Sequence, residues 1–387
     1  MKKNWDVKTL ESICWTVADI DHNMPKAVLD GIPFISAKDI TDDNKIDFSK
    51  TKFISKIDYE RLSRKINPQL GDIIYTRIGT IGKAAIVVDK ITFLPSYSCC
   101  TIRPREEFVN TDFLLFFLKS EVAIKQAKHG ANGAGVPDLG MKVIKNFQIP
   151  LPPLPEQQRI VAVLDKAFAA IDKAKANAEQ NLKNAKELFE SYLQFVFENK
   201  GDDWEEKNFE DCFKLKSGDG LTSKNMSEDG DFPVFGGNGI AGLHNKFNLS
   251  GSNVIIGRVG ALCGNVRHIT ENIWLTDNAF KVVDFKFEFD HSFLTYLLNY
   301  KNLRSFARQA AQPVISNSSL KDVVLEFPKA LKAQQSIVKK LDALSAETKK
   351  LEAIYQQKIK DLEELKKSVL QKAFSGELTT TKTEVYA

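Results

Sequence analysis

The segment "PEQQRIVAVLD" at residues 155–165 returns as "KAQQSIVKKLD" at residues 332–342. Each copy opens a long charged stretch in which seam positions recur at alternating steps of four and three, the spacing of a heptad repeat. This spacing predicts two long helices, and Gly201 and Gly376 lie just past the two patterns, where glycine is a suitable terminator. Seven apolar residues on these seams are our candidates for binding partners: Ile160, Leu164, Ile171, Leu188, Ile337, Leu341 and Leu365.

The repetition extends well beyond this one phrase. "GDIIYTRIGTIG" from Gly71 is echoed by "SNVIIGRVGALCG" from Ser252, and "FLLFFLK" from Phe113 is echoed by "FLTYLLN" from Phe293. The matches keep one order along the chain, and their offset drifts only from 181 to 177. Ordered matches at a slowly drifting offset indicate an internal duplication.

Each copy is expected to contain a mixed domain followed by a long helix. Short β-branched or aromatic runs between glycine turns, such as residues 72–78 and 253–259, predict strands. Helical spacing in residues 112–128 and 291–309 predicts helices that pack across the resulting sheets. The predicted division is 1–153 for the first mixed domain, 154–200 for the first long helix, 201–329 for the second mixed domain, 330–376 for the second long helix and 377–387 for a C-terminal tail.

The predicted fold class is α+β, with two mixed α/β globular domains related by a pseudo-twofold axis and separated by an antiparallel coiled coil. One long amphipathic helix cannot bury its own seam. The second mixed domain joins the end of the first helix to the start of the second, which favours antiparallel pairing of the two within one chain. The alternative is that the helices pair with those of other chains in separate oligomers.

The chain resembles the specificity subunit of type I restriction-modification enzymes over nearly its whole length. The resemblance is carried by "IPLPPLPEQQRIVAVLD" from Ile149, by the glycine loop "TRIGTIGKA" from Thr76 and by "FPVFGGNGIAG" from Phe232. The second copy departs from this pattern, because "FPKALKAQQSIV" lacks the proline cluster. That difference concerns the turn into the second long helix more than the helix itself.

The resemblance implies two target-recognition domains that each read one half of a split, asymmetric sequence in double-stranded DNA. It implies that the helical pair sets the spacer between the halves and that two methyltransferase subunits dock on the chain. Separate restriction and translocase subunits would complete the enzyme. S-adenosylmethionine, ATP and Mg²⁺ would then belong to these partner subunits, with no cofactor in this chain.

The residues themselves predict no catalytic site and no metal site. "GTIGKAA" from Gly79 has neither the spacing of a phosphate-binding P-loop nor the hydroxyl that follows its lysine, and the five histidines have no metal-ligand spacing. A coiled-coil scaffold or adaptor without DNA readout is the alternative to a DNA-specificity subunit. The absence of a long apolar run and of a signal peptide predicts a cytoplasmic protein without a membrane segment.

The paired glycine loops contain the best candidates for DNA contact. Glycine lets a backbone approach a phosphate or a base closely, and arginine fits guanine edges and phosphates. For Arg77 and Arg258 the alternative is a structural salt bridge, and for Asn132 and Asn238 it is a role in a turn. The predicted DNA-binding residues are Arg77, Gly79, Lys83, Asn132, Asn238, Arg258, Gly260, Asn265 and Arg267.

The net charge of the chain does not by itself indicate a nucleic-acid-binding protein. The formal charge is +4, with 22 basic and 18 acidic residues in 1–153 but 14 basic and 17 acidic residues in 201–329. Because phosphate contacts dominate the affinity for duplex DNA, we expect weak, salt-sensitive binding by the isolated chain. Partner subunits would supply much of the positive surface.

Overall fold

The computed structural model describes residues 5–22, 24–133, 135–308, 312–375 and 377. These residues form two compact units, one built from the segments 1–178 and 357–387 and the other from 179–356. Each unit therefore consists of one mixed domain and one portion of each long helix. Gly376, a predicted helix terminator, lies outside the described residues.

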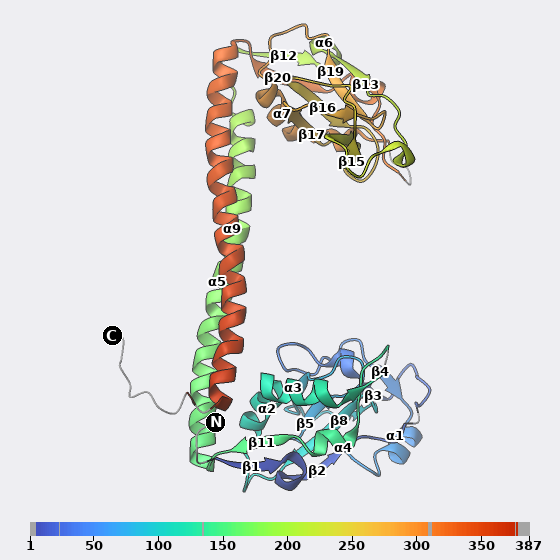
Figure 1. The fold of residues 1–387 in the computed structure, drawn as a ribbon, viewed down its shortest axis with the longest axis vertical. Coiled ribbons are helices and arrows are strands. Elements are labelled where there is room, and N and C mark those ends of the chain that lie inside the picture. Colours follow the sequence, from blue (N-terminus) through green and yellow to red (C-terminus); the bar gives the residue numbers. More distant parts are fainter. Residues whose placement is uncertain (1–4, 23, 134, 309–311, 376, 378–387) are drawn as a thin grey trace, which may run out of the picture. The chain divides into compact units, whose positions relative to one another are not determined.

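Unit 1 contains three principal sheets, drawn in blue to cyan in Figure 1. Strand β1 pairs with β11, four strands follow the order β2-β8-β5-β6, and three follow β4-β3-β7. The strands are β1 Asp6–Thr9, β2 Cys14–Ala18, β3 Ile32–Ile35, β4 Lys52–Ile54, β5 Ile73–Thr76, β6 Ala84–Ile86, β7 Leu94–Pro95, β8 Cys99–Pro104, β9 Ala131–Asn132, β10 Asp138–Leu139 and β11 Gln148–Leu151. The helices are η1 Leu10–Ile13, η2 Ala37–Asp39, α1 Lys56–Leu62, α2 Thr111–Lys119, α3 Glu121–Gly130 and α4 Met141–Lys145.

Unit 2 repeats the three principal sheets of unit 1. Strand β12 pairs with β20, four strands follow β13-β19-β16-β17, and three follow β15-β14-β18, the last pair again parallel. The strands are β12 Trp204–Asn208, β13 Lys214–Ser217, β14 Phe232–Gly236, β15 Gly239–His244, β16 Asn253–Gly257, β17 Val266–Ile269, β18 Trp274–Leu275, β19 Ala279–Val283 and β20 Val324–Pro328. The helices are α6 Phe209–Cys212, η3 Ser223–Asn225, α7 His291–Tyr300, η4 Leu303–Phe306 and α8 Asn317–Leu320. The predicted duplication is confirmed.

The helices predicted over residues 112–128 and 291–309 are interrupted in both units. Residues 112–128 form α2 and α3 rather than one helix, because Ser120 is extended and its side chain caps α3. In unit 2, α7 ends at Tyr300, and Asn302 adopts a left-handed conformation with φ 48°. Both α2 and α7 pack on the sheets, as predicted.

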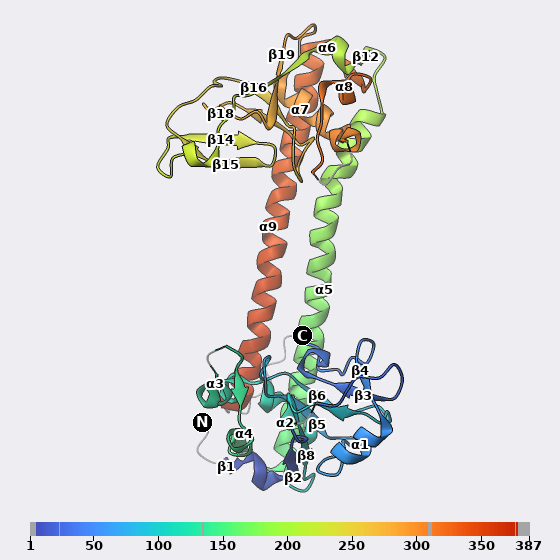
Figure 2. The same cartoon turned by 90° about the vertical axis from the view of Figure 1, so that its right-hand side faces the viewer.

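The long helices are α5 Leu154–Glu198 and α9 Leu331–Ser375. Within unit 1, Lys175 pairs with Glu363 at 2.6 Å and Asp172 pairs with Lys366 at 2.7 Å. Three steps forward in α5 thus correspond to three steps back in α9, which defines an antiparallel pair (Figure 1, Figure 2). The predicted pairing within one chain is therefore confirmed for this unit.

The recurring glutamines explain why the opening phrase repeats. In each unit the first glutamine of the pair is buried at the start of a long helix and accepts a hydrogen bond from the N-cap residue of a domain helix. Gln157 accepts from the amide of Asn110 at 2.8 Å, and Gln334 accepts from the amide of Asp290 at 2.9 Å. Each side-chain amide also donates to two backbone carbonyls of its domain, so the glutamine joins the long helix to the domain helix.

The predicted seam describes the buried face of each long helix only in part. Ile160, Leu164, Ile171 and Leu341 are buried and Ile337 is half-buried. Leu188 and Leu365 are 49% and 47% exposed, so their prediction as seam residues is wrong. An α-helix has 3.6 residues per turn, and a strict heptad pattern therefore drifts around a straight helix.

In the last turns of both helices the buried face follows steps of four instead. Phe197 of α5 packs against Phe293 of α7 in unit 2, with ring centroids 5.7 Å apart. Phe374 of α9 packs against Phe113 of α2 in unit 1, at 5.2 Å. Each long helix therefore ends by completing the core of a mixed domain.

Candidate nucleic-acid interface

Equivalent glycine loops follow the central strands β5 and β16. Gly79 and Gly82 have φ angles of 77° and 94°, and Gly260 and Gly264 have 105° and 85°. Only glycine adopts such angles at little cost. A Cβ on Gly264 would also lie 2.4 Å from the amide of Arg304, so the loop requires glycine there for space as well.

A second segment is held against each loop by matching backbone hydrogen bonds. In unit 1 the amide of Gly79 donates to Pro137 at 2.9 Å, and the amide of Leu139 donates to Arg77 at 2.9 Å. In unit 2 the corresponding bonds run from Gly260 to Pro313 at 3.1 Å and from Ile315 to Arg258 at 2.9 Å. The two loops are thus the same structural element in two copies.

The side chain of Arg77 is buried, with 4% of its surface exposed. Its Nε donates to Leu139 O at 3.0 Å, Nη1 donates to Tyr97 O at 2.7 Å, and Nη2 donates to Asp138 at 2.9 Å. Asp19 lies a further 3.6 Å from Nη1. Because the guanidinium is enclosed and engaged on all sides, the structure replaces the predicted direct DNA contact of Arg77 with the structural alternative.

The side chain of Arg258 is only half-buried and has far weaker partners. Its Nη1 lies 3.3 Å from the carbonyl of Asp277 and 3.5 Å from the hydroxyl of Ser217, and its guanidinium lies 5.3 Å from the ring centre of Phe280. In the described part of the chain, Arg258 forms no salt bridge, and its buried Nε has no hydrogen-bond partner.

In unit 2 the structure brings several other predicted residues together. The side chain of Asn238 accepts a hydrogen bond from the amide of Leu262 at 2.9 Å, and a Cβ on Gly260 would lie 2.6 Å from the same oxygen. A Cβ on Gly239, the next residue, would lie 3.0 Å from the guanidinium of Arg267. Turn 236–239 and loop 257–264 therefore form one surface. Loop 257–264 also carries the exposed side chain of Leu262, which sequence reasoning missed because a single exposed apolar residue has no distinctive pattern.

Asn265 acts through its backbone. Its carbonyl accepts from the amide of Gly257 at 2.9 Å, and its own amide donates to Leu262 at 3.2 Å. These bonds close the loop before strand β17. The side chain of Asn265 is half-buried beside this turn.

In unit 1, Gly79 and Asn132 line one surface hollow of about 410 Å³, together with Lys128 and Gly133. Asn132 lies on the β9–β10 hairpin, where it pairs with Asp138. Lys83 is directed elsewhere, because its ammonium lies 2.8 Å from Asp42 and lowers the pKa of that carboxyl group. The structure therefore groups Gly79 with Asn132 but separates Lys83 from them.

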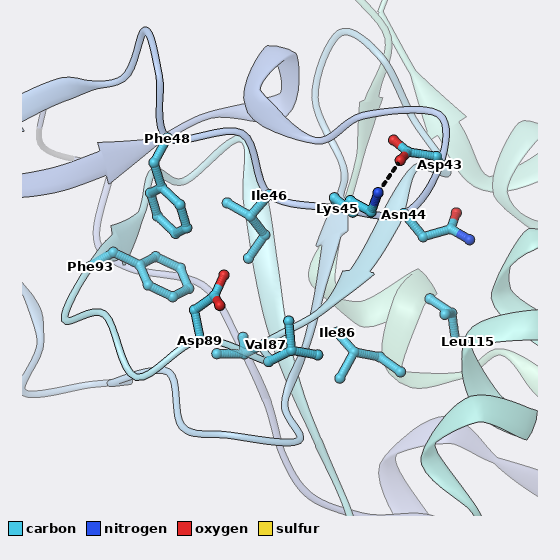
Figure 3. Close-up of a pocket in the computed structure, with 11 residues that line it drawn as sticks. Asp43, Asn44, Lys45, Ile46, Phe48, Ile86, Val87, Asp89, Phe93 and Leu115 are labelled. Atoms are coloured by element: carbon cyan, nitrogen blue, oxygen red, sulfur yellow. Dashed lines mark ion pairs between the residues drawn. The ribbon is translucent and has the colours of Figure 1, made fainter.

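A second hollow of unit 1, about 510 Å³ in volume, has mainly apolar walls (Figure 3). Ile46, Phe48 and Phe93 are among its lining residues, and the Asp43–Lys45 ion pair of 2.9 Å lies beside it. Among the described residues, no group of three or more histidine, cysteine, aspartate or glutamate side chains could hold a metal ion. The described helices also include none that is long and apolar enough to cross a membrane.

Comparison with known proteins identifies the same family in both copies. The family model described as the type I restriction modification DNA specificity domain matches residues 2–183 and again residues 201–361. The specificity subunit of the type I restriction enzyme EcoprrI of Escherichia coli is 25% identical over 311 residues, which cover 77% of this chain and 76% of that protein. The StySPI specificity subunit of Salmonella potsdam is 23% identical over 425 aligned positions, which cover 98% of this chain and 90% of the relative.

Solved structures share the fold. One chain, from work on complex assembly and conformational transition of the type I restriction-modification system, aligns with a TM-score of 0.80 at 20% identity, covering 97% of this chain and 99% of that chain. The HsdS subunit from Thermoanaerobacter tengcongensis aligns with a TM-score of 0.64 at 20% identity, covering 97% and 98% of the two chains. The predicted fold class is confirmed by these likenesses.

Proposed function

Because the chain belongs to the type I restriction modification DNA specificity family, we propose that its two mixed domains each read one half of a bipartite, asymmetric DNA target. The observation that carries this proposal is the repetition of one domain architecture in a single chain, with a glycine loop after the equivalent central strand of each copy. A split target requires two readers, and two domains with different loop side chains can read two different half-sites.

The long helices are proposed to dock two methyltransferase subunits and to set the spacer between the half-sites. The exposed apolar residues Leu188, Phe195 and Leu365 support a docking role. Apolar side chains in contact with water do not stabilise the helix, whereas burial under a partner subunit would favour binding. S-adenosylmethionine, ATP and Mg²⁺ are assigned to the methyltransferase and restriction subunits. This chain contributes recognition in the cytoplasm and no catalysis of its own.

Methylation mapping tests the proposal. A host that expresses the chain with its methyltransferase should carry a bipartite modified motif. Replacing residues 201–329 with the corresponding domain of a relative should change one half of that motif, and replacing residues 5–153 should change only the other half. If neither exchange altered the modified sites while the complex still assembled, a scaffold without DNA readout would be the better description.

A further inference from the structure

The strand registers identify which residues of unit 2 correspond to the partners of Arg77. In unit 2, Ser217 lies opposite Phe280, which pairs with Ile256, and in unit 1 the equivalent pair is Cys100 with Tyr75. Continuing the pair Ala18–Thr101 by one residue places Asp19 opposite Cys100, so Ser217 corresponds to Asp19. The isolated bridge from Ile78 to Asp138 has its counterpart in the bridge from Val259 to Val314. Both carboxylates that pair with the arginine in unit 1 are therefore missing at the same positions in unit 2.

This difference changes what the two arginines can bind. The guanidinium of Arg77 places all three nitrogens on protein oxygens at 2.7 to 3.0 Å. Among the described residues, the guanidinium of Arg258 has hydrogen-bond contacts only through Nη1, at 3.3 and 3.5 Å, besides its contact with the ring of Phe280, and its Nε has no hydrogen-bond partner. A guanidinium presents five N–H donors, and donors left without acceptors in a partly desolvated place are costly.

We infer that Arg258 is a DNA-contact residue that donates to oxygen or nitrogen acceptors of the half-site read by unit 2, whereas Arg77 holds its own loop in place. This inference rests on the proposed function. Unit 2 has neither of the two carboxylates, so no acidic side chain among the described residues pairs with the half-buried guanidinium of Arg258. A guanine edge or a phosphate offers the planar, acceptor-rich partner that such a fork fits.

The neighbouring groups are consistent with a recognition surface around Arg258. The side-chain oxygen of Asn238 accepts a hydrogen bond from the amide of Leu262. Its NH₂ group has no hydrogen-bond partner among the described residues and can donate to a base. The side chain of Leu262 is 45% exposed on the same loop and can contact a thymine methyl group. Donor and apolar groups thus lie on one short loop and the turn beside it.

The test restores the missing carboxylate while leaving Arg258 in place. In unit 1, Asp138 holds the arginine from the bridge position that Val314 occupies in unit 2. In the full chain with its methyltransferase, Val314→Asp should therefore pair with Arg258. Modification of the half-site read by unit 2 should fall at least about tenfold, the typical worth of one charge-assisted base contact. Val314→Asn is the matched control, because it has nearly the same shape without the charge, and it should stay close to wild type.

Arg258→Ala should reproduce the loss caused by Val314→Asp. Binding to duplexes that carry the mapped motif separates the two DNA partners: relaxed preference at one base pair identifies a base edge, and uniform weakening with a salt slope lower by about one identifies a phosphate. The domain exchange described above is run in parallel. If the exchange moved half of the motif but Arg258→Ala and Val314→Asp left modification unchanged, the inference about Arg258 would fall while the proposed function would stand.

Discussion

Arg77 joins three backbone segments of unit 1 through one side chain: the strand end that carries it, the segment at Tyr97 and the hairpin at Asp138 and Leu139. Because Asp19 is almost completely buried beside it, removal of the guanidinium would leave a carboxylate with less compensation in the interior. The hairpin that carries Asn132 would lose the same anchor. The effect of this residue on recognition is therefore expected to be indirect.

We predict that Arg77→Ala lowers the free energy of unfolding of unit 1 by about 3 kcal/mol, the usual cost of breaking a buried ion pair by removing one partner. Arg77→Lys should be intermediate, because an ammonium keeps the charge but cannot bridge three acceptors in a plane. Urea unfolding measures both variants. The mapped motif should weaken only in the half read by unit 1, and equal weakening of both halves would contradict this role.

At this scale the sequence predicted the two equivalent glycine loops but not which of their arginines is accessible. Four of the five glycines in "TRIGTIG" and "GRVGALCG", namely Gly79, Gly82, Gly260 and Gly264, are required by positive φ angles, a local property that sequence spacing reveals. The burial of Arg77 depends on Asp19 and Asp138, which are distant in sequence and meet it only in the folded domain.

Among the structural elements, the start of each long helix is fixed by one buried glutamine and followed by an exposed one. Gln157 and Gln334 are each completely buried and make three hydrogen bonds, while Gln158 and Gln335 face solvent. The second copy keeps this arrangement without the proline cluster of the first. The buried amide, rather than the prolines, is therefore the feature common to both helix starts.

We predict that Gln157→Ala lowers the free energy of unfolding by about 3 kcal/mol, because it leaves the amide of Asn110 and the carbonyls of Phe108 and Pro152 without this partner. Gln334→Ala should have a similar effect in unit 2. Gln158→Ala and Gln335→Ala are the matched controls and should change stability by less than about 0.5 kcal/mol. Comparable losses in all four variants would show that the hydrogen bonds of the buried glutamines are not responsible, because alanine favours the helix more than glutamine does.

A pair of histidines joins α7 to the sheet of unit 2. The hydroxyl of Ser252 lies 2.8 Å from a ring nitrogen of His268 and 2.8 Å from one of His291. Burial lowers the pKa of His291, and the neighbouring His268 lowers it further. The unfolded chain therefore takes up a proton at His291 at a higher pH than the folded chain does.

We predict that stability is retained above a pH of about 6.5, the ordinary pKa of histidine, and decreases as the pH falls below it. His291→Gln should reduce the fall in melting temperature between pH 7.5 and pH 5.5 by about 2 °C. His129→Gln, at an exposed position of α3, is the control and should leave that fall unchanged. The reverse trend, with greater stability at pH 5.5, would contradict the prediction.

For the whole molecule, the duplication could be predicted from sequence because the same phrases recur in the same order, and the sheet orders of the two units agree with it. The heptad pattern predicted the buried residues less well toward the C-terminal ends of the long helices. There, packing of Phe197 and Phe374 onto the mixed domains rotates the buried face away from Leu188 and Leu365. Such a rotation depends on the partner surface, which the sequence of the helix does not contain.

The proposed spacer role of the helices leads to a prediction about the complete protein. The ion pairs of Asp172 with Lys366 and of Lys175 with Glu363 set a register in which residues 173–179 face residues 359–365. Deleting both segments removes one heptad from each helix. Because Lys175 and Glu363 are both deleted, neither is left without its partner in this ion pair. A rise of 1.5 Å per residue shortens each helix by about 10 Å, which corresponds to about three base pairs.

Methylation mapping of this double deletion should therefore find both half-sites unchanged and a spacer shorter by up to about three base pairs. Deleting only residues 173–179 is the control. This deletion makes the two helices unequal in length and shifts their register, so it should reduce modification without producing a motif with a new spacer length. An unaltered spacer in a double-deletion protein that still modifies DNA would mean that the helices do not set the distance, and the spacing would then have to come from the partner subunits.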